Sequence, residues 1–289
     1  MGNRKFHFTG ADDLVMQELA QALQRAGDQV TSSGPSWTPD KVTADLNALI
    51  ISPSVTRDNP ELRKAQELKV PVNSYPEFFR QLCRNKHRVV VAGSSGKTMI
   101  TLLILHVLNH HNRKFDYLLA RQVPGVEHSI RLSDAPIVII EGQDGPCSVL
   151  DPTTRFLKYQ HHIGLISGIE WQESAAYPTK ADYTKQFSLF ETSTPKGGVL
   201  IYFDLEPVIT ALGKVNQPDV LYIPYKTHAS VYDGGQEYLA ESSSERHPFK
   251  LTGKHNLQNI SAAKETVKKL GITPSMFYEA VQHFGGKSI

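Results

Sequence analysis

Cysteine is scarce in this sequence, and long apolar runs are missing from it. Two cysteines among 289 residues, Cys83 and Cys147, are too few for a disulfide framework or a thiolate zinc site. We therefore expect each of them to be a small, half-buried apolar residue. No apolar run approaches the roughly 18 residues that a membrane-spanning helix needs. The N-terminus, residues 1–8, lacks the apolar core of a signal peptide. We therefore predict a cytoplasmic protein without a membrane span.

An excess of charge of one sign is also missing. Lysine and arginine number 31 against 29 aspartates and glutamates, which gives a formal net charge of +2 with no run of five like charges. This balance predicts no nucleic-acid partner. The sequence has no internal repeats and no low-complexity tracts. With 40% hydrophobic and 21% charged residues, the chain is long enough for about two domains with cores of their own.

The most informative stretch is the segment VVVAGSSGKT at residues 89–98. Its apolar start predicts a buried strand, and apolar residues recur at helical spacing after it. Gly93 and Gly96 let backbone N–H groups turn toward anionic oxygens, Lys97 supplies a positive charge, and Thr98 offers a hydroxyl to Mg²⁺. The segment therefore predicts a phosphate loop. The strict motif places its first glycine at Val91, so a Gly/Ser-rich turn with a solvated lysine is the alternative.

The other apolar segments alternate between strand and helix patterns. Before residue 87 we expect strands at 5–9, 46–53 and 70–72, and helices from Leu14 to Leu23, at 60–68 and at 75–82. After the phosphate loop we expect strands at 136–140, 163–167, 198–203 and 220–224, and hairpin-like turns at 233–235 and 242–245. Helices are expected at 180–191, near 207–212, over 260–270 and from 274 to 284.

This alternation predicts an α/β fold in which the strands are mainly parallel. We place a small N-terminal Rossmann-like domain at residues 1–86. A phosphate-loop central domain with a mainly parallel sheet is expected at residues 87–289.

An acidic residue follows the strand predicted at 136–140. Ligands of α/β folds gather outside the carboxyl ends of such strands, where a carboxylate can reach a metal ion. Glu141 is therefore the first metal candidate, and a carboxylate at a surface turn is the alternative. Glu170 and Glu173 follow the strand at 163–167 in the same way.

Polar side chains also gather near a predicted helix start. His255, Asn256 and Asn259 can hydrogen-bond a nucleotide base there, although helix capping by Asn256 is an alternative. Two pairs of adjacent histidines, 110–111 and 161–162, are interpreted as surface residues, because neighbouring side chains on a helix or a strand point in different directions.

In their order along the chain, these motifs resemble those of the Mur ligase family. The likeness covers nearly the whole sequence and is greatest to the muramate:alanine and murein tripeptide-recycling branches. The phosphate loop of this family has the shorter form Gly-x-x-Gly-Lys-Thr, as here. The segments that carry the resemblance are His7–Gly10 with Met16, Ser52-Pro53, Asp58–Leu62, Ala92–Thr98, Ile140-Glu141, Gly168–Glu170 and Gly253–Ile260.

The resemblance implies an ADP-forming ligase that uses ATP and Mg²⁺. Such an enzyme joins an amino acid or peptide to UDP-N-acetylmuramic acid through an acyl phosphate, in peptidoglycan synthesis or recycling. It also implies Lys97 and Glu141 as catalytic residues and Thr98, Glu141 and Glu173 as metal ligands. The residues implied to contact ATP are Gly93, Ser94, Ser95, Gly96, Lys97, Thr98, His255, Asn256 and Asn259.

The sequence departs from the family pattern at several places. Asp12 and Asp13 stand where the family has a glycine-rich loop facing a uridine diphosphate, which carboxylates would repel. Segment 31–45 is short, so we expect a strand and a helix of the first domain to be missing. Glu173 replaces a metal-binding histidine. The family continues past the position of Ile289, so we expect the C-terminal ligase domain to be absent.

Three functions stay open at this point. The first is a Mur-type ligase, or its first two domains. The second is a non-catalytic nucleotide-binding module derived from such a ligase, and the third is a kinase or another ATPase on the same core. Neither the ligated amino acid nor the oligomeric state follows from the sequence.

Overall fold

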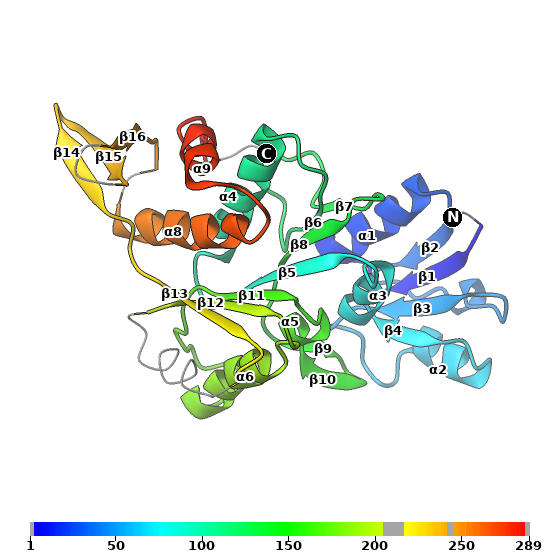
Figure 1. The fold of residues 1–289 in the computed structure, drawn as a ribbon. Helices are drawn as coiled ribbons and strands as arrows, with labels where there is room; N and C mark the ends of the chain where they lie inside the picture. Colours follow the sequence, from blue (N-terminus) through cyan, green and yellow to red (C-terminus); the bar gives the residue numbers. More distant parts are fainter. Residues whose placement is uncertain (1–2, 205–216, 242–244, 252, 287–289) are drawn as a thin grey trace.

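The computed structural model describes residues 3–204, 217–241, 245–251 and 253–286 (Figure 1). The chain forms a small parallel sheet first and a larger, mainly parallel sheet after it, each with helices packed against it. The predicted α/β class is confirmed. Within the described ranges, no helix combines the length and the apolar character needed to cross a bilayer.

The first sheet has four parallel strands in the order β2-β1-β3-β4. Its strands are β1 (Lys5–Thr9), β2 (Gln29–Ser33), β3 (Ala48–Ile51) and β4 (Val72–Ser74), and its helices are α1 (Leu14–Arg25), the short 3₁₀ helix η1 (Pro39–Lys41), α2 (Pro60–Glu67) and α3 (Tyr75–Leu82). The sequence did not predict β2 or η1. β2 is a polar, mostly exposed edge strand, so it has no apolar pattern.

A buried carboxylate joins the loops of this first sheet. Glu61 of α2 accepts hydrogen bonds from the hydroxyls of Thr9 (2.7 Å) and Ser33 (2.6 Å) and from the backbone N–H of Thr38 (2.5 Å). Nε2 of His7 lies 3.5 Å from Oε1, the same oxygen that accepts from Thr38. Burial alone would raise the pKa of Glu61, but these contacts outweigh it and lower the pKa to about 2.

The second sheet has seven strands in the order β13-β12-β11-β5-β8-β6-β7. All are parallel to their neighbours except β7, which is antiparallel to β6. The strands are β5 (His87–Ala92), β6 (Asp116–Leu118), β7 (Ile130–Arg131), β8 (Ile137–Glu141), β11 (Ile163–Ile166), β12 (Val199–Phe203) and β13 (Leu221–Tyr225). The sequence predicted β5, β8, β11, β12 and β13 and missed the two shortest.

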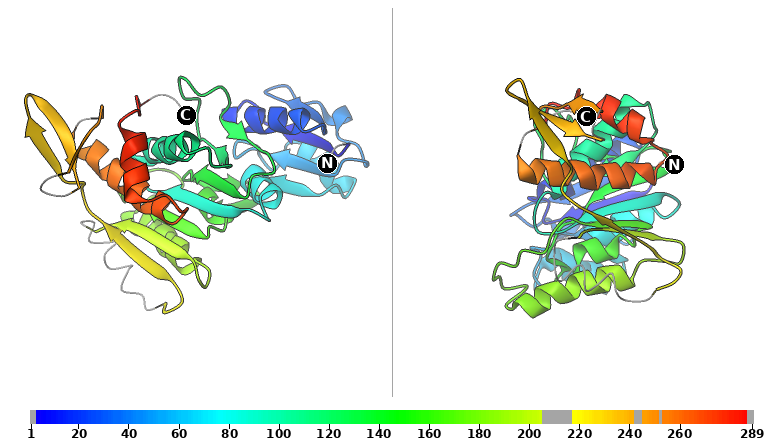
Figure 2. Two further views of the ribbon diagram at one scale, coloured as in Figure 1. Left: turned by 45° about the horizontal axis from the view of Figure 1, so that its top comes forward. Right: turned by 60° about the vertical axis from the view of Figure 1, so that its left-hand side comes forward.

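Helices cover both faces of the second sheet (Figure 2). On one face lie α4 (Lys97–His110), α8 (Lys254–Lys268) and α9 (Pro274–Val281), and on the other α5 (Arg155–Lys158) and α6 (Lys180–Thr192). Val89 and Val91 of β5 point into the core under α4, whereas Val90 and Ala92 join the core on the opposite face. That second core continues to Phe8 of the first sheet, so the two sheets are packed together.

Two small antiparallel sheets complete the fold. They consist of β9 (Pro146–Ser148) with β10 (Asp151–Thr154), and of β14 (Ser230–Asp233), β15 (Gln236–Ala240) and β16 (Arg246–Pro248). The predicted turn at 233–235 is confirmed, with positive φ angles at Gly234 (56°) and Gly235 (83°). The helix expected near 207–212 lies outside the described residues, as does most of the turn expected at 242–245.

The interpretation of His161 as a surface residue is wrong. Its side chain is 1% exposed, and its Nε2 lies 2.9 Å from the hydroxyl of Thr194. Burial lowers the pKa of His161 to about 3, so the ring stays neutral. Cys83 and Cys147 are free thiols and fully buried, more deeply than the sequence suggested.

Replacing Glu61 with Gln should lower the free energy of unfolding by about 2–3 kcal/mol at pH 7, because a charged acceptor of several hydrogen bonds is lost. The folded-state pKa lies below that of the unfolded chain, so this stabilisation is complete above about pH 5 and is lost as the pH falls toward 2. Urea unfolding at pH 7 and pH 3 measures both effects. Glu67→Gln, at an exposed position of the same helix, is the control. Equal stability of the two variants at pH 7 would contradict this account.

Candidate functional site

The carboxyl ends of three adjacent parallel strands meet at one edge of the second sheet. β5 pairs with β8 so that Val91 lies opposite Glu141, and with β11 so that Ala92 lies opposite Ile166. The segments that follow the three strands therefore lie side by side. Open α/β sheets bind their ligands at such an edge.

Glycine shapes the loop between β5 and α4 at two positions. Gly93 has a φ of 133°, and Gly96, the N-cap residue of α4, has a φ of 77°. A Cβ atom at Gly93 would lie 2.2 Å from Oγ of Ser167, and one at Gly96 would lie 2.4 Å from Oδ1 of Asn259. Both positions therefore require glycine. Among the residues that the structure describes, no side chain caps the N-terminus of α4, whose dipole favours an anion.

The segment after β11 holds this loop in place. The backbone N–H of Ser94 donates to the carbonyl of Gly168 (3.0 Å), and the backbone N–H of Glu170 donates to the hydroxyl of Ser94 (2.8 Å). Ser167 donates its hydroxyl to the carbonyl of Ser95 (2.5 Å). These contacts fix the loop while α4 remains uncapped.

The ammonium group of Lys97 lies among oxygen atoms at the mouth of the loop. Its Nζ donates to the carbonyl of Gly93 and lies 3.6 Å from Oδ1 of Asp144. The other carboxylate oxygen of Asp144 accepts a hydrogen bond from the hydroxyl of Tyr183 (2.7 Å). Sequence reasoning did not include Asp144 among the site residues. Its place three residues after Glu141, at the same strand end, is the signal that points to it.

Thr98 and Glu141 are directly hydrogen-bonded. The hydroxyl of Thr98 donates to Oε1 of Glu141 (2.5 Å), and the backbone N–H of Ala120 donates to Oε2 (3.0 Å). Glu141 is only 3% exposed, so the alternative of a carboxylate at a surface turn is wrong. A hydroxyl beside a carboxylate supplies the hard oxygen donors that Mg²⁺ prefers.

Two pockets of about 360 Å³ flank Ser94. The first is lined by Ser94, Ser95, Gly96, Lys97, Thr98, Met99, Arg121 and Glu141. The second is lined by Ser94, Asp144, Gly145, Glu170, Gln172, Ser174, Ala176, Tyr177 and Tyr183. Arg121 adds an exposed positive charge to the first pocket, and no sequence motif marked it.

The other residues predicted to belong to the site differ in how close they lie to the phosphate loop at residues 93–98. Asn259 of α8 lies against Gly96, as the close approach of its Oδ1 shows. His255 is exposed and Asn256 half-buried in the first turn of α8, and Gly253 rather than Asn256 is the N-cap residue. Glu173 is exposed and lines neither pocket.

A third pocket, of about 320 Å³, lies at the first sheet, where the loops after β1 and β3 meet. It is lined by Asp12, Asp13, Ser52, Pro53, Ser54 and Arg155. Asp13 caps α1, because its Oδ1 accepts a hydrogen bond from the backbone N–H of Val15 (2.8 Å). Arg155 donates to Gln143 (2.9 Å) and to the hydroxyl of Tyr75 (3.3 Å), so it links the two sheets beside this pocket.

Replacing Gly96 with Ala should destabilise the protein by about 1–2 kcal/mol through the left-handed backbone, and further through the clash with Asn259. Gly197→Ala is the matched control, because Gly197 has a φ of 74° and open space around it. Thermal unfolding should show a larger loss for Gly96→Ala, and Asn259→Gly added to it should recover part of the difference. Equal losses for the two single variants would contradict the close packing of Asn259 on the loop.

Known proteins resemble this chain in sequence and in fold. A family model described as "Mur ligase family, catalytic domain" matches residues 5–87, from β1 to the first residue of β5. The UDP-N-acetylmuramate--L-alanine ligase of Anaeromyxobacter dehalogenans (strain 2CP-C) is 24% identical over 314 residues, which covers 98% of this chain and 66% of that protein. The chain thus spans just under two thirds of the length of this relative.

Two solved structures superpose on nearly the whole chain. The UDP-N-acetylmuramate:L-alanyl-gamma-D-glutamyl-meso-diaminopimelate ligase of Neisseria meningitides gives a TM-score of 0.84 at 17% identity, over 98% of each chain. The murein peptide ligase of Psychrobacter arcticus 273-4 gives 0.80 at 16% identity, over 99% of this chain and 69% of that one. At such identities the structural likeness shows a shared fold. Together with the sequence matches over nearly the whole chain, it shows that this protein has the Mur ligase fold and is similar in sequence to Mur ligases.

Proposed function

We propose that residues 93–98 bind the phosphates of Mg·ATP and that the chain carries the ATP site of an ADP-forming ligase. The reaction would join an amino acid or peptide to UDP-N-acetylmuramic acid. The observation that carries the proposal is the uncapped N-terminus of α4, where Lys97 and the Thr98–Glu141 pair converge. The names of the relatives support the substrate class.

Each residue of the loop has a definite role in this proposal. The backbone N–H groups of residues 93–98 would hold phosphate oxygens, and Lys97 would exchange the carbonyl of Gly93 for one of them. Thr98 and Glu141 would hold Mg²⁺ through oxygen. Bound Mg·ATP supplies the phosphoryl group that turns a substrate carboxylate into an acyl phosphate.

Other predicted residues take peripheral positions. Asn259, Asn256 and His255 of α8 would lie around the adenine, with Asn259 already against the loop. Glu173 would hold a cation in the pocket beside Asp144, because its neighbours Gln172 and Ser174 line that pocket. This role requires the exposed side chain to turn inward.

We also propose two domains, at residues 1–86 and 87–289, with the sugar nucleotide bound at the first sheet. The pocket between the loops after β1 and β3 supports this placement, since those loops meet where the strand order of the first sheet reverses. The proposed place of action is the cytoplasm, with no nucleic-acid partner.

Lys97→Ala should weaken Mg·ATP binding by about 10- to 100-fold, because a charged hydrogen-bond donor to phosphate contributes about 1.5–3 kcal/mol. Calorimetric titration of wild type, Lys97→Ala and Lys226→Ala measures the effect. Lys226 is a matched control, because its side chain is 72% exposed. AMP, which lacks the outer phosphates, should bind wild type and Lys97→Ala equally. Unchanged Mg·ATP affinity in Lys97→Ala would contradict the proposal.

A second candidate function is a non-catalytic nucleotide-binding module. The observation that favours it is the carboxylate of Asp13, which already occupies the N-terminus of α1 where a diphosphate would bind, with Asp12 beside it. Under this alternative the protein binds Mg·ATP and does not bind UDP-N-acetylmuramic acid.

Titration of UDP-N-acetylmuramic acid into wild type separates the two candidates, and the paired substitution Asp12→Asn with Asp13→Asn tests the part played by the two carboxylates. Asparagine keeps the helix cap and removes both negative charges. The repulsion is about 1 kcal/mol for each carboxylate, so affinity for UDP-N-acetylmuramic acid should rise by about 10-fold or more. Saturable binding of this nucleotide by wild type supports the ligase, and its absence beside tight Mg·ATP binding supports the module. If the substitution leaves the affinity for UDP-N-acetylmuramic acid unchanged, the charges of Asp12 and Asp13 do not control binding in this pocket.

A further inference from the structure

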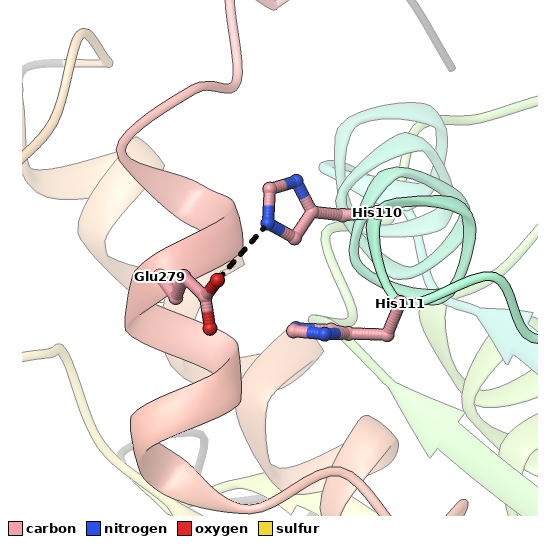
Figure 3. Close-up of side chains that lie close together, drawn as sticks. All are labelled: His110, His111 and Glu279. Carbon is pink, nitrogen blue, oxygen red and sulfur yellow. Dashed lines mark ion pairs between the residues drawn. The ribbon is translucent and has the colours of Figure 1, made fainter.

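A cluster of imidazoles and one carboxylate lies where the end of α4 meets α9 (Figure 3). One ligand atom from each of His110, His111 and Glu279 lies within 4.8 Å of the other two. Nε2 of His110 is 3.7 Å from Oε1 of Glu279. Two more imidazole rings adjoin His110, with centroids at 6.2 Å for His106 and 5.6 Å for His283. The ring of His283 is stacked on that of His110.

His110 and His111 are less exposed and closer together than the sequence suggested. His110 is the last residue of α4, and His111 is its C-cap residue, with φ −96° and ψ 20°. Because the backbone leaves the helix at this point, the two rings approach to a centroid distance of 4.9 Å in an edge-to-face arrangement. Both side chains are half-buried beside α9 (Figure 3).

Backbone carbonyls of α9 orient two of these rings. Nε2 of His111 is 2.8 Å from the carbonyl oxygen of Met276, and Nε2 of His106 is 3.0 Å from that of Ala280. A carbonyl accepts a hydrogen bond only from a protonated ring nitrogen, so Nδ1 carries the lone pair of each neutral ring. Such carbonyl contacts are the usual support of metal-binding histidines. The helix that carries Glu279 thus also positions His111.

From this geometry we propose that His110, His111 and Glu279 form a site for a divalent cation of the zinc class. Imidazole and carboxylate donors suit such ions. Donor atoms around tetrahedral zinc lie about 3.3 Å apart, given bonds of about 2.0–2.1 Å, so pairs of ligand atoms that now lie within 4.8 Å must approach by up to about 1.5 Å. The side chain of Glu279 is 60% exposed and can make this movement. Water would complete the tetrahedral coordination, as it does at zinc sites with three protein ligands.

This site differs from the proposed nucleotide site in place and in chemistry. The phosphate loop precedes the first turn of α4, and the histidine cluster lies at its last, about 21 Å away along a 14-residue helix. The donor atoms at the nucleotide site are hydroxyl and carboxylate oxygens, whereas those at the histidine cluster are mainly imidazole nitrogens. A cation here would join the end of α4 to α9 and stabilise the docking of α9 on α4.

Calorimetric titration of the metal-free full chain with zinc chloride tests the proposal. We expect one zinc ion per chain and a rise in melting temperature on saturation. Glu279→Gln and His110→Ala should each weaken zinc binding at least about 10-fold. Glu265→Gln, on the neighbouring helix, and His128→Gln, beside Glu18, are matched controls that should bind as wild type does.

Cobalt substitution supplies a second readout. Cobalt(II) bound by wild type should show the visible absorption of a nitrogen- and oxygen-ligated ion, and His111→Ala should lose it. Circular dichroism verifies that each variant folds, and unchanged Mg·ATP affinity in Glu279→Gln separates this site from the nucleotide site. No saturable zinc binding by wild type, binding without a fixed stoichiometry, or equal affinity in Glu279→Gln would overturn the proposal.

Discussion

The pairing of β5 with β8 and β11 is the constraint on which the candidate nucleotide site depends. Its register places Glu141 and the segment after β11 beside the turn that follows Ala92. β5 itself is held between two apolar cores, with Val89 and Val91 on one face and Val90 on the other. The loop can therefore keep glycine-only backbone conformations that a less tightly held turn would relax. Burial in the sheet is thus what positions Lys97 and Thr98 for chemistry.

The N-termini of α4, in the second sheet, and of α1, in the first sheet, differ in their electrostatic environment. α4 begins at Gly96 with no side-chain cap, and its nearest positive charge, Lys97, is held by an oxygen of the loop and by Asp144. α1 begins with the carboxylate of Asp13 already on the backbone N–H of Val15. A phosphate at the N-terminus of α4 would be attracted by the helix dipole and by the ammonium group of Lys97, which can turn toward it. One arriving at α1 must displace or tolerate an existing negative charge.

The parts of the site that are local in sequence could be predicted from it. Residues 89–98 form a strand, a turn and a helix within one continuous segment, and Glu141 ends the next strong apolar strand. β2 and β6 could not be predicted, because one is polar at a sheet edge and the other has only three residues. Arg155 and the cluster around His110 arise from contacts between distant segments. The burial of His161 likewise depends on Thr194, which no periodicity in the sequence associates with it.

The most direct test of the account is a crystal structure of this chain with magnesium and a non-hydrolysable ATP analogue. The account predicts the outer phosphates against the backbone N–H groups of residues 93–98, with Lys97 turned from the carbonyl of Gly93 to a phosphate oxygen and the metal ion next to Thr98 and Glu141. A nucleotide bound elsewhere, with Lys97 still on Gly93 and Asp144, would contradict it.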